Sequence, residues 1–301
     1  MGLVLENVSK SYGDKKAVEK ISFSLEKPGI FGLLGTNGAG KTTTIRMILG
    51  ILNKDEGNIT WNGKEVNRKS VNFGYLPEER GVYPKTKIID QLTYFAELKG
   101  IKKEDAVKAI EYWAKKLNVE EYLMQTPEKL SKGNQQKVQF MTAIIHDPEL
   151  VILDEPFSGL DPVNTELLKN IIIELIEKGK YIIMSAHQMA TIEEFCKDII
   201  ILNKGKTVLK GNLQDIRNTY PANRIEVNLY DEKDMENLKE LAAKENLIVE
   251  EALSNKVFLK LENEKQAQNL LNGLVKDNVK IEKFEVMKPT LNDIFIEKVG
   301  E

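Results

Sequence analysis

Residues 35–42 read "GTNGAGKT" and match the pattern G-x-x-x-x-G-K-[ST], with an apolar run before them and a helical pattern after them. The glycines let the backbone curl, so that successive N–H groups and the positive end of the helix point at phosphate oxygens. Lys41 adds a point charge, and the Thr42 hydroxyl is a hard ligand for Mg²⁺. The predicted phosphate-binding residues are Gly35, Asn37, Gly38, Ala39, Gly40, Lys41, Thr42 and Thr43.

A second chemical element is the acidic pair that ends the apolar run "LVILDEP". Asp154 can hold the same Mg²⁺, directly or through water. Glu155, the next residue, can take a proton from an attacking water, a role typically worth about 10² to 10⁴ in rate. Such a pair can also be a helix cap or a solvated pair, but the phosphate loop favours the catalytic interpretation.

His187 follows the apolar run "YIIMSA" and is the third candidate for the same site. It can donate to a terminal phosphate or orient water, and the convergence of three strand ends favours this role over surface packing. The chain's other histidine, His146, is expected to be structural.

The elements that must position these groups alternate short β-rich runs with longer helical patterns over residues 1–216. "GIFGLLG", "LVILDEP" and "YIIMSAH" are nearly continuous apolar runs, which is typical of buried parallel strands with ligands at their carboxyl ends. Residues 86–145 are helical in pattern and predict a helical subdomain.

Residues 221–301 have a different texture. Alternating apolar residues begin at Ile225, and the order of elements β-α-β-β-α-β predicts a small α+β ferredoxin-like domain. Its two helices carry apolar stripes, which we interpret as core. The stripes comprise Met235, Leu238, Leu241 and Ala242, then Ala267, Leu270, Leu271, Leu274 and Val275. The chain ends in a helix that Pro289 and Thr290 open.

Composition excludes several classes of protein. The 43 basic and 46 acidic residues give a net charge of −3, so no global positive field favours nucleic acid. The single cysteine, Cys196, excludes an internal disulfide and multi-thiolate metal sites, and we expect it to pack in a helix. The apolar runs fall short of the roughly 18 residues that a spanning helix needs, and the N-terminus has no secretory signal pattern.

The stretch "LSKGNQQKVQ", residues 130–139, looks like the opening of a helix whose first N–H groups are bare, which is a second site shaped for an anion. With the motifs above in this order, residues 1–216 resemble the ATP-binding cassette of ABC transporters, a P-loop NTPase fold. In that family two cassettes pair head to tail, and this signature motif of one caps the γ-phosphate held by the other. The resemblance assigns that role to Ser131, Gly133 and Asn134.

The resemblance also assigns Tyr12 as the aromatic that stacks on adenine and Asp161, in "SGLD", as part of the loop that crosses the dimer interface. Tyr12 in isolation can equally be a packing residue. The resemblance implies ATP and Mg²⁺ as the cofactors, with Thr42, Glu78 and Asp154 as metal ligands.

Four positions depart from the family pattern. Lys132 and Asn134 stand where relatives usually have Gly and Gln, and the Lys132 charge either tightens closure or points to solvent. Glu78 stands where relatives commonly have Gln, so it either ligates Mg²⁺ with a full charge or belongs to a charged turn. Thr36 replaces a common Pro and is expected to matter little.

The function that the resemblance implies is ATP hydrolysis driving transport, most similar to bacterial sodium and drug exporters with a C-terminal accessory domain. The implied partners are a second copy or a paralogous cassette and a separate integral membrane permease, at the cytoplasmic face of the membrane. A small GTPase is disfavoured because "LNKGK" does not match the N-K-x-D guanine motif. The alternatives are a soluble ABC ATPase acting on ribosomes or nucleic acid, and a regulatory module that hydrolyses ATP poorly.

Overall fold

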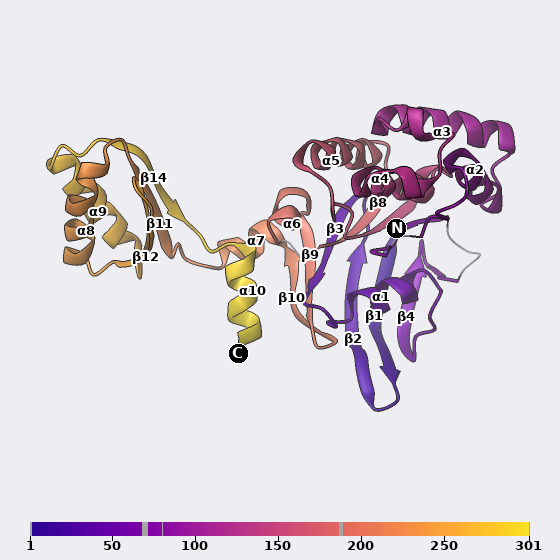
Figure 1. Ribbon diagram of the computed structural model, residues 1–301. Coiled ribbons are helices and arrows are strands. Elements are labelled where there is room, and N and C mark those ends of the chain that lie inside the picture. The colour runs from indigo at the N-terminus through magenta and orange to yellow at the C-terminus, as the bar shows by residue number, and fades with distance from the viewer. Residues whose placement is uncertain (1, 68–71, 80, 187–188, 301) are drawn as a thin grey trace. The chain divides into compact units, whose positions relative to one another are not determined.

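The structure is a computed structural model that describes residues 2–67, 72–79, 81–186 and 189–300. These residues form two compact units, Met1–Asn212 and Leu213–Glu301. Both are shown in Figure 1, and each is described by itself. No helix in the described part of the chain combines the length and apolar character that crossing a bilayer demands.

The described residues of the first unit build a six-stranded sheet with the order β10-β9-β3-β8-β7-β6. Strands β9, β3, β8, β7 and β6 run parallel, and β10 is antiparallel to β9. The bounds are β3 (Gly29–Gly35), β6 (Phe73–Leu76), β7 (Leu150–Asp154), β8 (Tyr181–Ala186), β9 (Asp198–Asn203) and β10 (Lys206–Asn212). The three apolar runs predicted to be buried parallel strands are β3, β7 and β8, and every residue of β7 is buried.

A second, antiparallel sheet has the order β2-β1-β4-β5 among the described residues. Its strands are β1 (Leu3–Tyr12), β2 (Lys15–Leu25), β4 (Glu56–Trp61) and β5 (Lys64–Glu65). Helix α1 (Lys41–Ile48) shares one apolar core with both sheets through residues such as Ile45 and Ile48, and Figure 1 shows it beside β1, β2 and β4. This packing fixes the start of α1 at the end of β3, where the phosphate loop lies.

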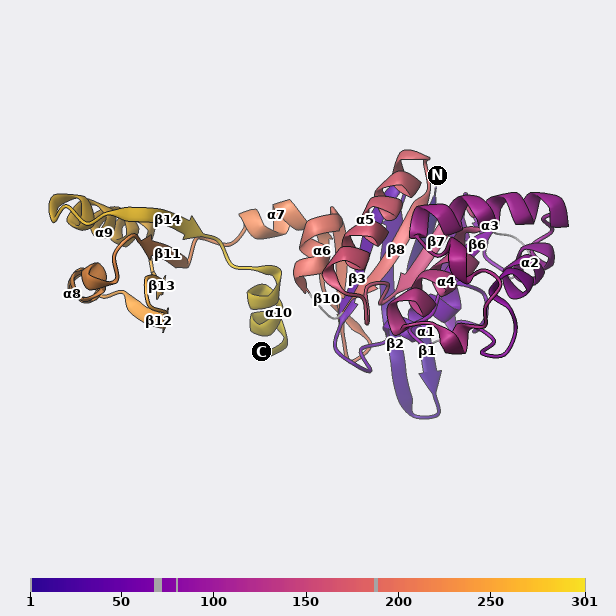
Figure 2. The same cartoon turned by 45° about the horizontal axis from the view of Figure 1, so that its top comes forward.

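The segment predicted to be helical contains α2 (Ile88–Leu98), α3 (Lys103–Leu117) and α4 (Lys132–Ile144), with the short 3₁₀ helices η1 (Glu120–Tyr122) and η2 (Pro127–Lys129) between α3 and α4. Figure 2 shows these three helices gathered beside β6 and β7, and α4 packs directly on β6. Helices α5 (Pro162–Glu177) and α6 (Met189–Phe195) follow. Cys196 was expected to pack in a helix but lies just after the end of α6; it is buried, and burial raises the pKa of its thiol.

The second unit contains a sheet with the order β12-β13-β11-β14 and has the predicted β-α-β-β-α-β sequence of elements. Its elements are α7 (Leu213–Asn218), β11 (Arg224–Leu229), η3 (Glu232–Asp234), α8 (Met235–Lys244), β12 (Ile248–Ala252), β13 (Lys256–Lys260), α9 (Glu264–Lys276), β14 (Ile281–Met287) and α10 (Leu291–Gly300). Ala267, Leu270 and Leu274 of α9 belong to the core. Leu271 and Val275 do not: Leu271 is only partly buried, and Val275, about 100° further round the helix than Leu274, is 63% exposed.

Candidate nucleotide site

The phosphate loop lies between the end of β3 and the start of α1. Gly40 is the N-cap of α1 and has a φ of 107°, a conformation that L side chains rarely adopt. A Cβ on Gly40 would lie 2.6 Å from the carbonyl oxygen of Ala17. Both constraints require glycine at this position, and the tight loop is the physical reason for the sequence pattern.

This loop forms one wall of a cavity of about 420 Å³. The cavity brings together most of the predicted nucleotide-binding residues, including the adenine-stacking candidate Tyr12, which is 52% exposed. Its lining residues are Tyr12, Lys15, Ala17, Thr36, Asn37, Gly38, Ala39, Gly40, Lys41, Thr42, Thr43 and Glu78. Lys15, Ala17 and Thr36 were not among the predicted residues; β2 and the loop after β3 bring them there.

Lys41 is 7% exposed, and its ammonium is held inside the loop. The Nζ atom donates to the carbonyl oxygens of Gly35 at 2.6 Å and Thr36 at 3.4 Å. Burial lowers the pKa of Lys41, and the charges of Glu155, Asp154 and Glu78 partly oppose that shift. The three predicted carboxylates therefore lie within electrostatic reach of the predicted phosphate-binding cation.

Asp154 ends β7 and is 2% exposed. Strands β7 and β8 pair in a register that sets it opposite Ser185, whose hydroxyl donates to Oδ1 of Asp154. This hydrogen bond orients a carboxylate that the sequence alone could place only at a strand end. Ser185 was not among the site residues predicted from the sequence. The feature that could have indicated it is its place as the polar residue just before the end of the apolar run "YIIMSA".

Glu155 has a φ of 53°, in the left-handed region that costs a non-glycine residue about 1–2 kcal/mol. Its N–H donates to the carbonyl oxygen of Ser185 at 3.2 Å, which holds the turn. The half-buried side chain lines a second cavity, of about 390 Å³, together with residues 156–160, Thr165, Ala186 and Thr191. Strain at a single carboxylate beside the phosphate loop is typical of a functional position.

The donors near the loop fit Mg²⁺ by their chemistry. Thr42 supplies a hydroxyl, and Asp154 and Glu78 supply carboxylates, all hard oxygen ligands. Glu78 and Thr42 line the same cavity. Within the described ranges, no cluster of three or more His, Cys, Asp or Glu residues is suited to hold a metal by itself.

The signature residues lie elsewhere. Ser131 is the N-cap of α4, and its hydroxyl accepts a hydrogen bond from the N–H of Asn134 at 3.3 Å. The expectation of a wholly bare first turn was therefore wrong, because the cap uses one of those groups. Among the described lining of the phosphate cavity, Ser131, Gly133, Asn134 and Asp161 do not occur. Asp161 instead caps α5, where it accepts from the N–H of Asn164 at 2.9 Å.

Comparison with known proteins places this geometry in a family. Residues 18–158 match the family described as "ABC transporter", and residues 211–299 match "ATP-binding protein DrrA1-3-like, C-terminal domain". The chain is 46% identical over 299 residues to the uncharacterized ABC transporter ATP-binding protein YhaQ of Bacillus subtilis, covering 99% of this chain and 98% of that protein. The chain belongs to the ABC transporter ATP-binding proteins.

Further comparisons agree with the fold and the family. The linearmycin resistance ATP-binding protein LnrL of Bacillus subtilis is 35% identical over 218 residues, which cover 71% of this chain and 70% of that one. A solved structure of an ATP-binding subunit of an ABC transporter superposes with a TM-score of 0.68 at 32% identity, covering 73% of this chain and 93% of that one. The recognition of an ABC cassette from the motifs is confirmed, and this ABC protein is an ATP-binding subunit of a family that hydrolyses ATP.

The two histidines of this ABC protein had different predicted roles. His187, the predicted third catalytic group, lies outside the described residues. His146 is buried, and its Nε2 lies 2.9 Å from the carbonyl oxygen of Phe73, as a structural histidine would.

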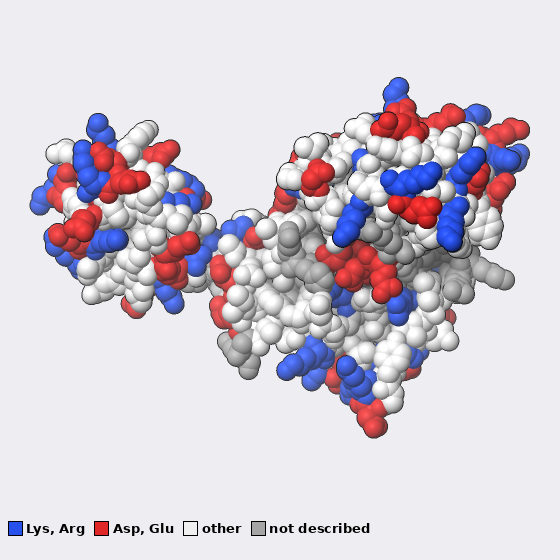
Figure 3. All heavy atoms as spheres, in the orientation of Figure 1, with Lys and Arg blue, Asp and Glu red and all other residues white. Residues whose placement is uncertain are grey.

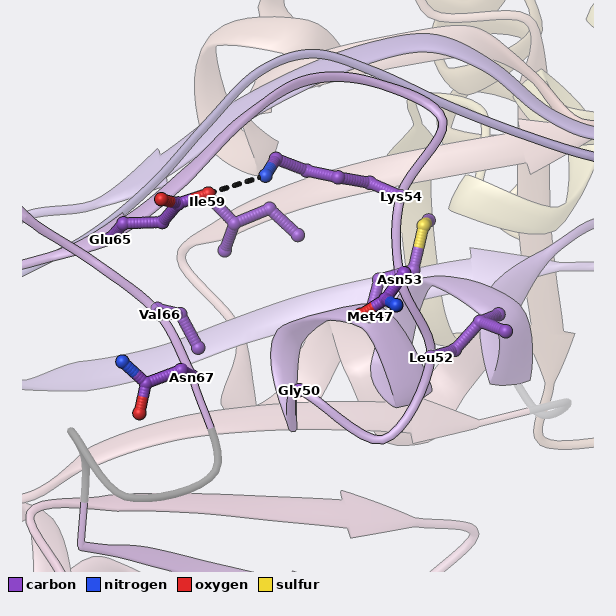
Figure 4. Close-up of a pocket in the computed structure, with 9 residues that line it drawn as sticks. All are labelled: Met47, Gly50, Leu52, Asn53, Lys54, Ile59, Glu65, Val66 and Asn67. Atoms are coloured by element: carbon purple, nitrogen blue, oxygen red, sulfur yellow. Dashed lines mark hydrogen bonds and ion pairs between the residues drawn. The ribbon is translucent and has the colours of Figure 1, made fainter.

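A separate hollow of about 390 Å³ lies at the opposite end of α1 from the phosphate loop (Figure 4). Met47, Leu52, Ile59 and Val66 give it apolar walls. Lys54 forms an ion pair of 2.7 Å with Glu65 there, so its charge is offset within the protein. Lys54 of this hollow is therefore paired with a carboxylate, whereas Lys41 of the phosphate cavity donates to the neutral carbonyl oxygens of Gly35 and Thr36.

Proposed function

We propose that this ABC protein is the ATP-hydrolysing subunit of an exporter, and that it powers a separate membrane permease through ATP-driven pairing of two cassettes. The observation that carries the proposal is the separation of two half-sites on one chain. The phosphate loop, Asp154 and Glu155 supply one half, and the capped start of α4 at Ser131 supplies the other. Two copies, or one copy and a paralogous cassette, would complete each other's sites.

In this proposal the phosphate loop and Lys41 bind the phosphates, and Tyr12 stacks on adenine. Lys41 would exchange its hydrogen bonds to Gly35 and Thr36 for phosphate oxygens. Ser131, Gly133 and Asn134 of the second copy would add donors and the positive end of α4 at the γ-phosphate.

Glu155 acts as the general base. It takes a proton from a water whose oxygen forms a bond to the γ-phosphorus while the bond to the β,γ-bridging oxygen breaks, which yields ADP and phosphate. Asp161 and His187 would position the water and the γ-phosphate. Thr42, Asp154 and Glu78 would hold Mg²⁺, which supplies charge neutralisation at the phosphate oxygens.

A cavity of about 500 Å³ supports contact with a permease. Apolar side chains from the segment after α1, from β6 and from α2 line it, among them Phe73, Phe95 and Leu98. Gln139 of α4 also lines it and donates to the carbonyl oxygens of Pro77 and Glu79, at 3.1 and 2.9 Å, on either side of Glu78. A helix seated in this cavity would therefore be linked through Gln139 to the segment that carries a predicted metal ligand.

Export, rather than import, is supported by the relative LnrL, whose name assigns it to linearmycin resistance. We propose residues 1–216 as the cassette, with a helical subdomain at about 86–145, and residues 221–301 as an accessory domain. The proposed location is the cytoplasmic face of the cell membrane. Both basic and acidic side chains lie on the face of each unit that Figure 3 shows. A protein that acts on ribosomes would instead be expected to gather basic side chains on one face.

The experiment is to tag the Glu155→Gln variant, trap it with MgATP in its source cells and identify what co-purifies in mild detergent. The variant should bind ATP without turning it over, and a polytopic membrane protein should be recovered in stable proportion. Recovery with ribosomes or soluble factors alone would overturn the transport assignment. Undiminished hydrolysis by the Glu155→Gln variant would overturn the assignment of the base.

A further inference from the structure

Helix α4 carries an unusual run of buried polar side chains directly after the signature residues. Gln136, Lys137 and Gln139 are 5%, 3% and 2% exposed. Gln139 holds the Glu78 segment, as described above. Gln136 and Lys137 instead face a different part of the chain, the loop that follows Glu155.

Lys137 is the costly member of this run, because a buried ammonium loses its hydration. Its Nζ donates to Oδ1 of Asn164 at 3.0 Å, and this amide is a neutral partner. Burial lowers the pKa of Lys137, while the Asp161 carboxylate offsets part of that shift by its charge. An apolar side chain of similar length would fill this space at a lower cost in desolvation.

Asn164 passes the contact on to Asp161. While its Oδ1 accepts from Lys137, its Nδ2 donates to Oδ2 of Asp161 at 2.6 Å and its N–H donates to Oδ1 at 2.9 Å. Both oxygens of the Asp161 carboxylate are thus fixed by one residue, and the Lys137 ammonium sets the orientation of that residue's amide. The result is a chain of hydrogen bonds from the interior of α4 to the last residue before α5.

The other end of the same loop is held from the same helix. Gln136 Nε2 donates to the carbonyl oxygen of Pro156 at 3.1 Å, directly after Glu155. Between the two anchors, Gly133 lies against the loop, where a Cβ would be 3.5 Å from Leu160 and 3.9 Å from the carbonyl oxygen of Gly159. Two successive side chains of α4 therefore tie down residues 156–161 at both ends.

From this geometry we infer that Lys137 is a positioning residue for ATP hydrolysis: acting through Asn164, it fixes the loop between Glu155 and Asp161 to the signature helix of the same chain. The inference rests on the proposed role of Glu155. Any rotation of α4 is then transmitted to the loop beside the base as well as to the signature residues at its own N-terminus. Lys137 does not touch nucleotide; it acts on where the reacting groups lie.

The test uses the purified full-length protein and compares kcat and KM for ATP in four single variants and one double variant. Lys137→Met removes the ammonium and keeps an unbranched side chain, Lys137→Arg keeps a donor, and Asn164→Ala removes the relay. Val138→Ala is the matched control, because Val138 is fully buried on the same helix but carries no polar link to the loop. The melting temperature of each variant measures the structural loss.

Lys137→Met should lower kcat about tenfold or more with KM for ATP nearly unchanged, since misplaced groups slow the chemical step while the phosphate loop still binds. Lys137→Arg should recover most of that loss. The double variant Lys137→Met with Asn164→Ala should be no slower than the worse single variant, because both break one chain of contacts.

A kcat of Lys137→Met close to that of the wild type would overturn the inference. The inference would also be overturned if Lys137→Met and Val138→Ala lost kcat in the same proportion to their loss of melting temperature. Lys137 would then have a purely structural role. If Lys137→Met does not fold, Asn164→Ala takes its place. A kcat close to that of the wild type, or a loss of kcat in the same proportion to the loss of melting temperature as in Val138→Ala, would then overturn the inference. Failure of the base assignment is read separately, from activity retained by Glu155→Gln.

Discussion

The ammonium of Lys41 donates a hydrogen bond of 2.6 Å to the carbonyl oxygen of Gly35, six residues earlier in its own loop. This predicted phosphate-binding cation therefore has a hydrogen-bond partner within the protein before any phosphate binds. We expect ATP to displace this hydrogen bond and to place negative charge next to the buried ammonium. Binding of ATP should for that reason stabilise the protonated form of Lys41.

The first prediction concerns the pH dependence of ATP affinity. Burial lowers the pKa of Lys41 in the free protein below 10.5, so the free protein loses this proton at a lower pH than the unfolded chain. Above the lowered pKa, ATP binding must take up a proton, and ATP affinity should fall as pH rises toward 10.5. Equilibrium ATP binding measured from about pH 7.5 to about pH 10 checks this.

Lys41→Arg provides the comparison, because guanidinium does not titrate in this range. If both proteins bind ATP at all, the wild type should lose affinity earlier than the variant as pH rises. Parallel profiles for the two would contradict the prediction. Other lysines with lowered pKa values titrate alike in both proteins and cancel in the difference.

A second prediction separates backbone strain from steric clash in the phosphate loop. Gly40 and Gly38 both have positive φ values, 107° and 76°. A Cβ on Gly40 meets the carbonyl oxygen of Ala17 at 2.6 Å, whereas one on Gly38 meets nothing within 4 Å. Gly40→Ala should therefore lower the melting temperature and weaken ATP binding much more than Gly38→Ala, which costs about 1–2 kcal/mol of local strain.

Thermal unfolding and ATP binding of the two variants, side by side, provide the measurement. Equal losses would mean that φ alone sets the requirement for glycine. The contact with Ala17 would then have no energetic weight.

What the sequence predicted well was local or periodic. The phosphate loop follows from glycine spacing, and the buried strands from continuous apolar runs, because each is set by neighbouring residues. The cap that Ser131 forms on the N–H of Asn134 is also local, because serine is a preferred N-cap residue. Leu271 and Val275 lie outside the core, so the apolar stripe predicted for α9 was too wide.

Contacts between distant segments could not be predicted. Ser185 faces Asp154 only because β7 and β8 are paired in one register. Lys137 is buried and donates to Asn164, 27 residues later at the start of α5, and no local pattern indicates that contact. These features come from tertiary packing, which single-sequence patterns do not encode.

A third prediction follows from His146. Burial lowers the pKa of its imidazole to about 4, against 6.5 when unfolded. The unfolded chain therefore binds more protons between these values, and the folded state loses stability as pH falls below 6.5. At about pH 5.5 the wild type should have lost about 1 kcal/mol of unfolding free energy from this group.

His146→Gln keeps a donor for the carbonyl oxygen of Phe73 but does not titrate. Urea denaturation of both proteins at about pH 7.5 and about pH 5.5 isolates the histidine, because the carboxylates respond alike in both. The unfolding free energy of the wild type should fall further than that of the variant. An identical fall in both proteins would show that protonation of His146 does not lower the unfolding free energy.

The last prediction concerns the contact between α3 and α5. Glu174 of α5 accepts hydrogen bonds from Lys116 at 2.8 Å and Tyr112 at 2.7 Å, both on α3, and forms an ion pair with Lys178 at 2.8 Å. The hydrogen bond from Lys116, followed by those from Lys178 and Tyr112, lowers the pKa of Glu174 to about 2. The cluster ties the segment that carries the signature helix to the body of the cassette.

Because the folded pKa of Glu174 lies below 4.5, its stabilisation is fully present above that value and is lost as pH falls through about 2. Glu174→Gln should lower the unfolding free energy by about 1 kcal/mol at neutral pH, a modest value because water partly screens the cluster. The difference from the wild type should shrink by about pH 3. Glu177→Gln, at an exposed position on the same helix, should change stability by less than about 0.5 kcal/mol. Equal effects of the two substitutions would mean that the three donors of Glu174 add nothing to the contact between the helices.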